Sequence, residues 1–248
     1  IPELSISSVV TTSVCPIRFF LGQKGTVPES PRYTVAKQIS YHLGTDMSGE
    51  EIWEEILLIQ KENIQEARDF FEECMKLCHN NPEWRRCSDS DVKVNSATYH
   101  IHGIVDKIFD DKPVFSIIRP SHAPQSGIYT SDRLRVAAYT ACLQEMLGEE
   151  IDGGCVEYIP SGITRFCKVE PIDKRRFLRA LHETRRIRNG GMPEGRFARH
   201  AGTARRMGAA VLTMEGGYRI SSKRCESGRS VQEISNAAML PALPVLRQ

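Results

Sequence analysis

The chain has 248 residues, enough for one large domain with its own hydrophobic core. It carries 33 Lys and Arg against 31 Asp and Glu, and 40% of its residues are apolar, which excludes global disorder and a uniformly basic nucleic-acid coat protein. No apolar run approaches the roughly 20 residues of a membrane span, and the opening residues lack the basic-then-apolar pattern of a signal peptide. We therefore expect a soluble, cytoplasmic protein without a membrane partner, whose eight cysteines are free thiols.

An acidic helical region is predicted over residues 46–90. Ser48 can cap a helix, and Glu51 follows three residues later, as in a capping box. Apolar residues then recur at roughly helical spacing as far as Pro82, which stops the pattern. This pattern predicts either one long helix or two shorter ones.

The hydrophobic period changes after residue 90. Partial alternation and short apolar runs predict strands, and a broad apolar stripe predicts one helix among them. The predicted elements are, in chain order, strands within 92–109 and at 114–118, a helix at 134–147, strands at 155–158 and 163–169, and a basic helix at 174–188.

These elements predict an α/β fold (α+β in some schemes) with a central mixed sheet flanked by helices. We divide the chain into one domain over residues 1–220 and a weakly ordered tail over residues 221–248. The domain is expected to contain a helical insertion at 46–90, a sheet core at 91–170 and a basic helical segment at 171–209.

Several short motifs occur in a recognisable order. They are Ser13-Val-Cys15-Pro16-Ile-Arg18-Phe19-Phe20 near the start, Gly103-Ile-Val-Asp106 on a predicted strand, an apolar strand eleven residues later, and Arg135-Val-Ala-Ala-Tyr139 on the following helix. In this order they resemble the RecB-like branch of the PD-(D/E)XK nucleases, and within it the CRISPR-associated exonuclease family. The resemblance runs from residue 8 to about residue 209, apart from the acidic insertion, and it implies a restriction-endonuclease-like fold.

Such a nuclease needs carboxylates that converge on a divalent cation, Mg²⁺ or Mn²⁺, and a lysine that organises the attacking water. The resemblance places Asp106 at the metal-binding aspartate of the family. It places His42, near the end of an early helix, at a metal-contacting histidine. These two residues are the candidate metal ligands.

The chain departs from the family at the other catalytic positions. Ile117 falls at the second metal-binding carboxylate and Arg119 at the lysine. Arg135 replaces the glutamine of the family's Gln-x-x-x-Tyr motif, whereas Tyr139 is retained. Because isoleucine cannot ligate a metal and arginine stays protonated, we expect weak binding of a divalent cation and weak or lost hydrolysis.

A geometric expectation follows from the resemblance. His42, Asp106, Arg119 and Tyr139 should converge on one side of the sheet. Asp106 and Arg119 are then expected to form an ion pair in place of the metal site. Together with Arg135, the last three residues are the candidate catalytic positions.

Cys15 matches the first cysteine of the family's iron–sulfur cluster. The three other cluster positions fall at His200, Thr203 and Ala209, none of which can supply a thiolate. One thiolate cannot hold a four-cysteine cluster, so we expect no iron–sulfur cluster and a colourless protein.

Charge is strongly segregated along the chain. Residues 44–73 contain ten acids and two bases, whereas residues 171–206 contain eleven bases and three acids. A basic segment of this kind can neutralise phosphates and release counterions, so we predict DNA binding there. The predicted DNA-binding residues are Arg175, Arg179, Arg185, Arg186, Arg188 and Arg199.

Three functions remain open from the sequence. The first is a DNA-binding protein, specific for ends or single strands, with weak or lost hydrolysis. The second is an active exonuclease that uses a substitute acid such as Asp110 or Asp111, although both precede the expected strand register. The third is a non-catalytic assembly or regulatory protein whose acidic helices, within residues 46–73, contact a protein partner.

Overall fold

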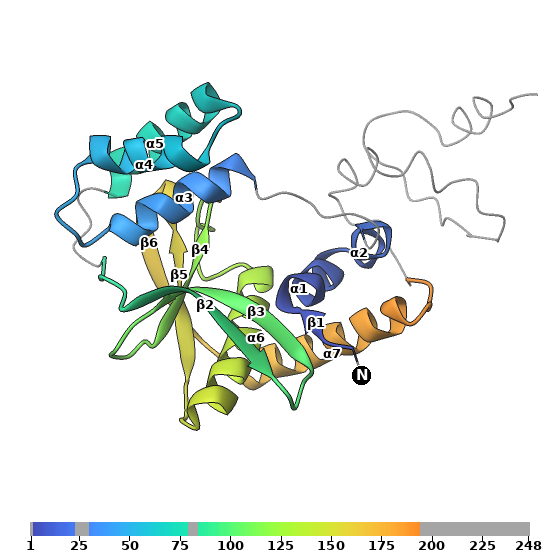
Figure 1. Cartoon of the computed structure of the whole chain (residues 1–248). Helices are drawn as coiled ribbons and strands as arrows, with labels where there is room; N and C mark the ends of the chain where they lie inside the picture. The colour runs from blue at the N-terminus through green and yellow to red at the C-terminus, as the bar shows by residue number, and fades with distance from the viewer. Residues whose placement is uncertain (1, 23–29, 79–83, 194–248) are drawn as a thin grey trace, which may run out of the picture. The chain divides into compact units, whose positions relative to one another are not determined.

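The structure is a computed structural model that describes residues 2–22, 30–78 and 84–193. Within these ranges the chain forms six strands, seven α-helices and one short 3-10 helix (Figure 1). The elements are β1 (Leu4–Ser5), α1 (Ile6–Val14), α2 (Pro16–Gly22), α3 (Pro31–His42), α4 (Gly49–Ile59), α5 (Ile64–Cys78), β2 (Asp89–Ser96), β3 (Ile101–Ile108), β4 (Phe115–Arg119), α6 (Thr130–Leu147), β5 (Gly153–Tyr158), the 3-10 helix η1 (Ile159–Ser161), β6 (Ile163–Lys168) and α7 (Pro171–Arg188).

The six strands form one open, mixed sheet. β1, β3, β4, β5 and β6 follow one another across it, and β2 pairs with β3. β2, β3 and β4 are antiparallel neighbours, whereas β4 and β5 are parallel and are connected by α6. The predicted α/β fold with a mixed sheet is therefore confirmed. β1 was not predicted, because two residues are too few to carry a periodic pattern.

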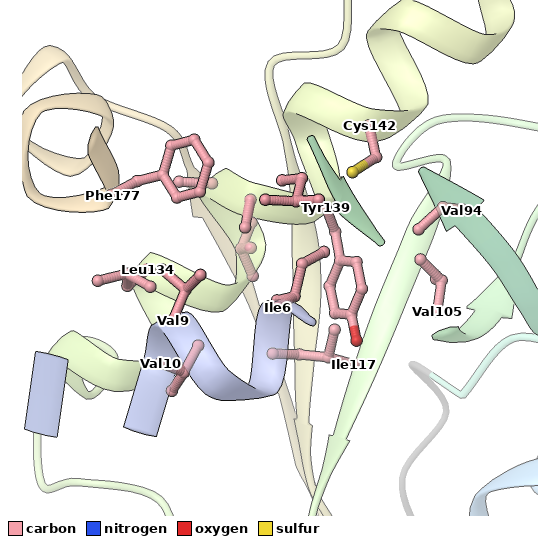
Figure 2. Packing of buried hydrophobic residues seen from close by; sticks show 14 of the residues in the cluster. Ile6, Val9, Val10, Val94, Val105, Ile117, Leu134, Tyr139, Cys142 and Phe177 are labelled. Carbon is pink, nitrogen blue, oxygen red and sulfur yellow. The ribbon is translucent and has the colours of Figure 1, made fainter. Parts of the chain in front are cut away.

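Two apolar clusters cover opposite faces of the sheet. Successive residues of a strand point to opposite faces. Phe115 and Ile117 of β4 accordingly lie in a cluster with α1, α6 and α7, whereas Ile118 lies in a cluster with α3, α4 and α5. Figure 1 shows these two groups of helices on opposite sides of the sheet. Figure 2 shows Ile117 among buried residues of the first cluster.

The acidic region forms two helices, α4 and α5, rather than one. The predicted capping box is confirmed: the Ser48 side chain accepts a hydrogen bond from the backbone N–H of Glu51, and the Glu51 carboxylate accepts one from the backbone N–H of Ser48. Each helix buries one apolar side against α3 in the second cluster, with Ile52 and Ile56 from α4 and Phe70 and Phe71 from α5. Their acidic residues are left on the outside.

The basic helix α7 starts at Pro171, three residues earlier than predicted. Glu170 and Asp173 form a capping box around this proline, which is favoured at the first position of a helix. Arg133 of α6 donates from Nε to Asp173 Oδ1 over 3.0 Å. This contact fixes the start of α7 against α6.

A buried ion pair joins α3 to three strands. The Lys107 ammonium lies 3.3 Å from Glu157 Oε1 and donates to the backbone carbonyl of Ser40 over 2.9 Å. The hydroxyls of Ser40 and Ser116 donate to the two oxygens of Glu157 over 2.5 and 2.7 Å. All four residues are buried. Each polar group of the pair thus has partners, as burial of charge requires.

Residues 194–248 lie outside the described part of the chain. The predicted tail at 221–248 and the end of the basic segment fall there. Among the described helices, none has both the length and the apolar composition needed to cross a bilayer.

Candidate functional site

Asp106 lies where β3 lacks a neighbouring strand on one edge. β2 pairs with β3 from residue 101 to residue 108. On the other edge, β1 pairs only with residues 101–102 and β4 only with residues 107–108. Residues 103–106 of β3 therefore have no paired strand, among the described elements, on the edge that faces β4, and we call this unpaired stretch the strand gap. Within it the described strands leave backbone groups without ladder partners.

Two side chains supply the missing hydrogen bonds in the strand gap. Asp106 Oδ2 accepts from the backbone N–H of Ile118 over 2.8 Å, and the Tyr139 hydroxyl donates to the backbone carbonyl of Ile104 over 2.6 Å. Figure 2 shows the ring of Tyr139 extending from α6 past Ile6 toward the strand that carries Val105. The gap is thus closed by side chains from a strand and a helix.

Gly103 allows the Tyr139 ring to approach β3. A Cβ atom on this glycine would lie 2.8 Å from the ring and 3.0 Å from the side chain of Ile6. Any other residue would push the ring away from Ile104. The glycine of the Gly-Ile-Val-Asp motif therefore has a packing role beside Asp106.

The second carboxylate oxygen of Asp106 is also occupied. The Tyr33 hydroxyl of α3 donates to Oδ1 over 2.5 Å. Burial raises the pKa of Asp106, and the hydrogen bonds from Tyr33 and Ile118 and the nearby cations of Arg135 and Lys37 offset only part of this rise. Both oxygens of the carboxyl group therefore face protein donors in a dry environment.

A row of α3 residues contributes to this site. Tyr33, Lys37 and Tyr41 are spaced four residues apart and lie on one face of the helix. The Lys37 ammonium lies 2.5 Å from Asp91 Oδ1 and within 5.8 and 5.7 Å of the Tyr33 and Tyr41 ring centres. Asp91 adopts a left-handed backbone conformation with φ of 54°, which is uncommon for a residue other than glycine. Burial, Asp91 and Asp106 all raise the pKa of Tyr41.

We call Tyr33, Lys37, Asp106, Arg135 and Tyr139 the Asp106 site. Three of its members were predicted from the sequence and two, on α3, were not. The repeated spacing of Tyr33, Lys37 and Tyr41 was the only sequence signal for them. That signal could not show which strand the helix covers.

The expected ion pair between Asp106 and Arg119 is wrong. Arg119 Nε lies instead 2.9 Å from Oδ1 of Asp132 on α6. Oδ2 of the same aspartate accepts from the Tyr158 hydroxyl over 2.9 Å. Asp132 is buried, so it holds Arg119 against α6 rather than toward the strand gap. The cause is a carboxylate on the following helix that the strand pattern could not reveal.

His42 has a different partner from the one expected. Its Nε2 lies 2.7 Å from Glu55 Oε2 on α4. It follows Tyr33 by nine residues, which corresponds to about 13 Å along a helix. The described structure shows no contact between His42 and Asp106. Of the four residues that were predicted to converge, Asp106 and Tyr139 lie close together, and His42 and Arg119 have other partners. Arg135 lies near both Asp106 and Tyr139.

The side chains around Asp106 do not form a suitable set of ligands for a divalent cation. Mg²⁺ and Mn²⁺ favour several oxygen ligands, preferably carboxylates. Here the only carboxylate of the site has both oxygens engaged by protein donors, and the residue aligned with the second carboxylate, Ile117, is fully buried among apolar side chains. Lys37 and Arg135 add positive charge that would repel a cation.

The proposed substitute acids lie away from this site. Asp111 lies in the exposed turn between β3 and β4 and forms an ion pair with Arg85. Asp110 is exposed in the same turn. Cys15, the expected cluster residue, follows α1 and its sulfur accepts from the backbone N–H of Arg18 over 3.4 Å. The other cluster positions, His200, Thr203 and Ala209, lie outside the described residues.

Part of the predicted DNA-binding set is engaged within the protein. Arg185 donates to the backbone carbonyl of Tyr99 over 2.7 Å, and Arg186 donates twice to Glu183 over 2.8 Å. Arg188 is exposed and donates to the carbonyl of Glu3 over 3.0 Å. The contacts of Arg185 and Arg188 tie the end of α7 to the rest of the domain, whereas Arg186 and Glu183 both belong to α7. Arg199 lies outside the described residues.

The first half of α7 presents cations outward. Lys174, Arg175 and Arg179 are exposed, and no ion pair is formed by them with other described residues. The opposite side of the helix buries Phe177 and Leu181 in the first apolar cluster. We call the exposed side, from residue 172 to residue 182, the α7 outer face.

Comparison with known proteins gives no family assignment: no protein-family model matches the chain, and no curated protein has significant sequence similarity to it.

Proposed function

We propose that the chain binds DNA, at ends or along single strands, with the fold of a RecB-like nuclease and with weak or no phosphodiester hydrolysis. The observation that carries the proposal is the α7 outer face, where Lys174, Arg175 and Arg179 are exposed without ion-pair partners among the described residues. Cations placed in this way can neutralise phosphates and release the counterions that surround them.

The Asp106 site supports the second part of the proposal. Hydrolysis by a nuclease of this type requires a metal held by at least two carboxylates. At the positions aligned with that chemistry, Ile117 is buried and apolar, and Arg119 is paired with Asp132. Asp106 itself accepts hydrogen bonds on both oxygens. In this arrangement the carboxylate stabilises the strand gap rather than a cation.

An equilibrium binding assay tests the proposal. The full-length protein is titrated into fluorescein-labelled single-stranded and blunt duplex oligonucleotides at several salt concentrations. The variant Lys174→Glu/Arg175→Glu/Arg179→Glu should bind more weakly. The slope of log K against log salt should fall by roughly two to three units, because each lost phosphate contact removes about 0.7 to 0.9 unit.

A matched control separates a local effect from a change in net charge. Lys76, Lys93 and Lys112 are exposed lysines on α5, on β2 and in the turn before β4. Their triple change to Glu alters the net charge by the same amount away from α7. If this control weakens DNA binding as much as the α7 variant does, the assigned surface is wrong. Binding by neither the parent nor the control would reject the proposed function.

Cleavage is measured on the same oligonucleotides with Mg²⁺ and with Mn²⁺. We expect binding without appreciable product. Rapid, metal-dependent degradation that is lost on Asp106→Ala would instead favour the active exonuclease and overturn the assignment of Asp106 to a stabilising role.

A further inference from the structure

Two exposed surfaces of this protein are complementary to each other. The first is the end of the α4–α5 hairpin, where three large apolar side chains are exposed within seven residues: Leu58 (73% exposed), Ile59 (56%) and Ile64 (46%). Glu54, Glu62 and Glu66 are exposed around them. We call this surface the α4–α5 tip.

The second surface is the α7 outer face. Its cations stand beside two exposed apolar residues, Ile172 (43%) and Leu178 (46%). α7 as a whole carries seven Lys or Arg against two acids, whereas α4 carries four acids and no Lys or Arg. The tip also carries one exposed cation, Lys61, so its three acids outnumber its bases. Each surface therefore combines apolar side chains with an excess of charge of one sign, and the signs are opposite.

The two surfaces cannot meet within one molecule. α4 and α5 pack in the apolar cluster that contains Ile118, and α7 packs in the cluster that contains Ile117. Neighbouring residues of one strand point to opposite faces of the sheet, so the two helical groups lie on opposite sides (Figure 1). The α4–α5 tip can therefore contact an α7 outer face only when that face belongs to another molecule.

We propose that the α4–α5 tip of one copy binds the α7 outer face of a second copy. Leu58 and Ile59 would be removed from water against Leu178 and Ile172, and the tip acids would face the α7 cations. Because different surfaces are joined, the contact is heterologous, and the resulting dimer keeps one free α4–α5 tip and one free α7 outer face. Association should therefore continue beyond the dimer as concentration rises.

The proposed contact makes self-association sensitive to salt. Exposed ion pairs are screened within about 10 Å at 0.1 M salt and within about 3 Å at 1 M. The apolar part alone is a small patch, so high salt should separate the copies. The same α7 face is our proposed DNA-binding surface. This consequence rests on the proposed DNA-binding function: if the α7 outer face binds DNA, DNA should compete with self-association.

Sedimentation velocity on the full-length protein tests the inference. At 50 mM NaCl the weight-average sedimentation coefficient should rise with protein concentration, and at 0.5 M NaCl it should be that of a monomer. The variants Glu54→Lys/Glu62→Lys/Glu66→Lys and Lys174→Glu/Arg175→Glu/Arg179→Glu should each remain monomeric at low salt. Circular dichroism verifies that both variants are folded.

Mixing these two charge-reversed variants gives the decisive result. The reversed tip of one is basic and the reversed α7 face of the other is acidic, and the remaining unchanged surfaces also attract each other. The equimolar mixture should therefore associate although neither variant does so alone. A mixture that stays monomeric while the parent associates would overturn the proposed pair of surfaces.

The apolar contribution has its own control. Leu58→Asp should abolish self-association, whereas Leu77→Asp should not, because Leu77 is similarly exposed (52%) at the far end of α5. A parent protein that is monomeric at 50 mM NaCl and high concentration rejects the inference outright. Assemblies that form but do not dissociate on addition of a single-stranded oligonucleotide would retain self-association and count against the proposed DNA-binding face.

Discussion

The buried pair Lys107–Glu157 makes a quantitative prediction about stability. Both side chains are inaccessible to water, and Glu157 is held by the hydroxyls of Ser40 and Ser116 as well as by the Lys107 ammonium. We consider Glu157→Gln, Lys107→Met and the double variant. Each single change removes one charge and leaves the other one buried without its counterion.

The magnitude follows from that uncompensated charge. Removing one member of a buried ion pair costs about 3–5 kcal/mol of unfolding free energy. Replacing both members removes the need to bury any charge. One serine hydroxyl can still donate to the Gln carbonyl oxygen, and the other can accept from the Gln amide N–H. We therefore expect the double variant to lose only about 1–2 kcal/mol. The coupling energy between the two sites should be several kcal/mol.

Urea denaturation followed by circular dichroism measures these values, because urea is uncharged and does not screen the ion pair. The m-value should be unchanged, so that differences in midpoint report stability. If Glu157→Gln costs less than about 1 kcal/mol, or if the two single changes are additive in the double variant, the pair is not a coupled buried unit. The conclusion that this ion pair connects α3 to the sheet as one energetic unit would then be wrong.

Three further predictions concern individual positions. Ile117→Glu places a carboxylate in the apolar cluster and should lower stability by several kcal/mol; recovery of its melting temperature with Mn²⁺ would support the alignment with a metal-binding glutamate, and no recovery would oppose it. Burial raises the folded-state pKa of Asp106 above the unfolded value of 3.8, so ionisation of this carboxyl should cost the parent stability as pH rises above that value. Asp106→Asn removes this contribution, so in urea titrations the unfolding free energy of the parent minus that of Asp106→Asn should be smaller at pH 7 than at pH 4. Burial raises the pKa of Cys142 to about 12 and that of Cys167 to about 11, so iodoacetamide at pH 8 should modify both thiols only after unfolding; rapid labelling of the folded protein, located by peptide mapping, would refute their burial.

Elements that bury one periodic face could be predicted from the sequence. The capping box of α4 and the apolar stripe of α6 depend on residues three or four positions apart, and such local spacing survives in any tertiary context. The strand meander was predictable for the same reason. Bounds differed where a cap lay outside the pattern, as at Pro171 of α7.

Partners of the candidate site residues could not be predicted in the same way. The Tyr33–Asp106 hydrogen bond joins residues 73 positions apart, and Arg119 is paired with an aspartate on another element. Whether a cation contacts solvent or a carbonyl depends on packing that no local spacing encodes. Arg185 illustrates this point, because its position in a basic helix predicts phosphate binding although its guanidinium binds the carbonyl of Tyr99.

A ligand that binds to Asp106 would compete with the hydrogen bonds that hold the sheet together at the strand gap. A cation that took this carboxylate as a ligand would deprive the Ile118 amide and the Tyr33 phenol of their acceptor. Both β4 and α3 would then lose the hydrogen bond that connects them to Asp106 of β3. Occupancy of such a position is therefore linked to local opening of the sheet, and hydrogen exchange at the Ile118 amide would report it directly.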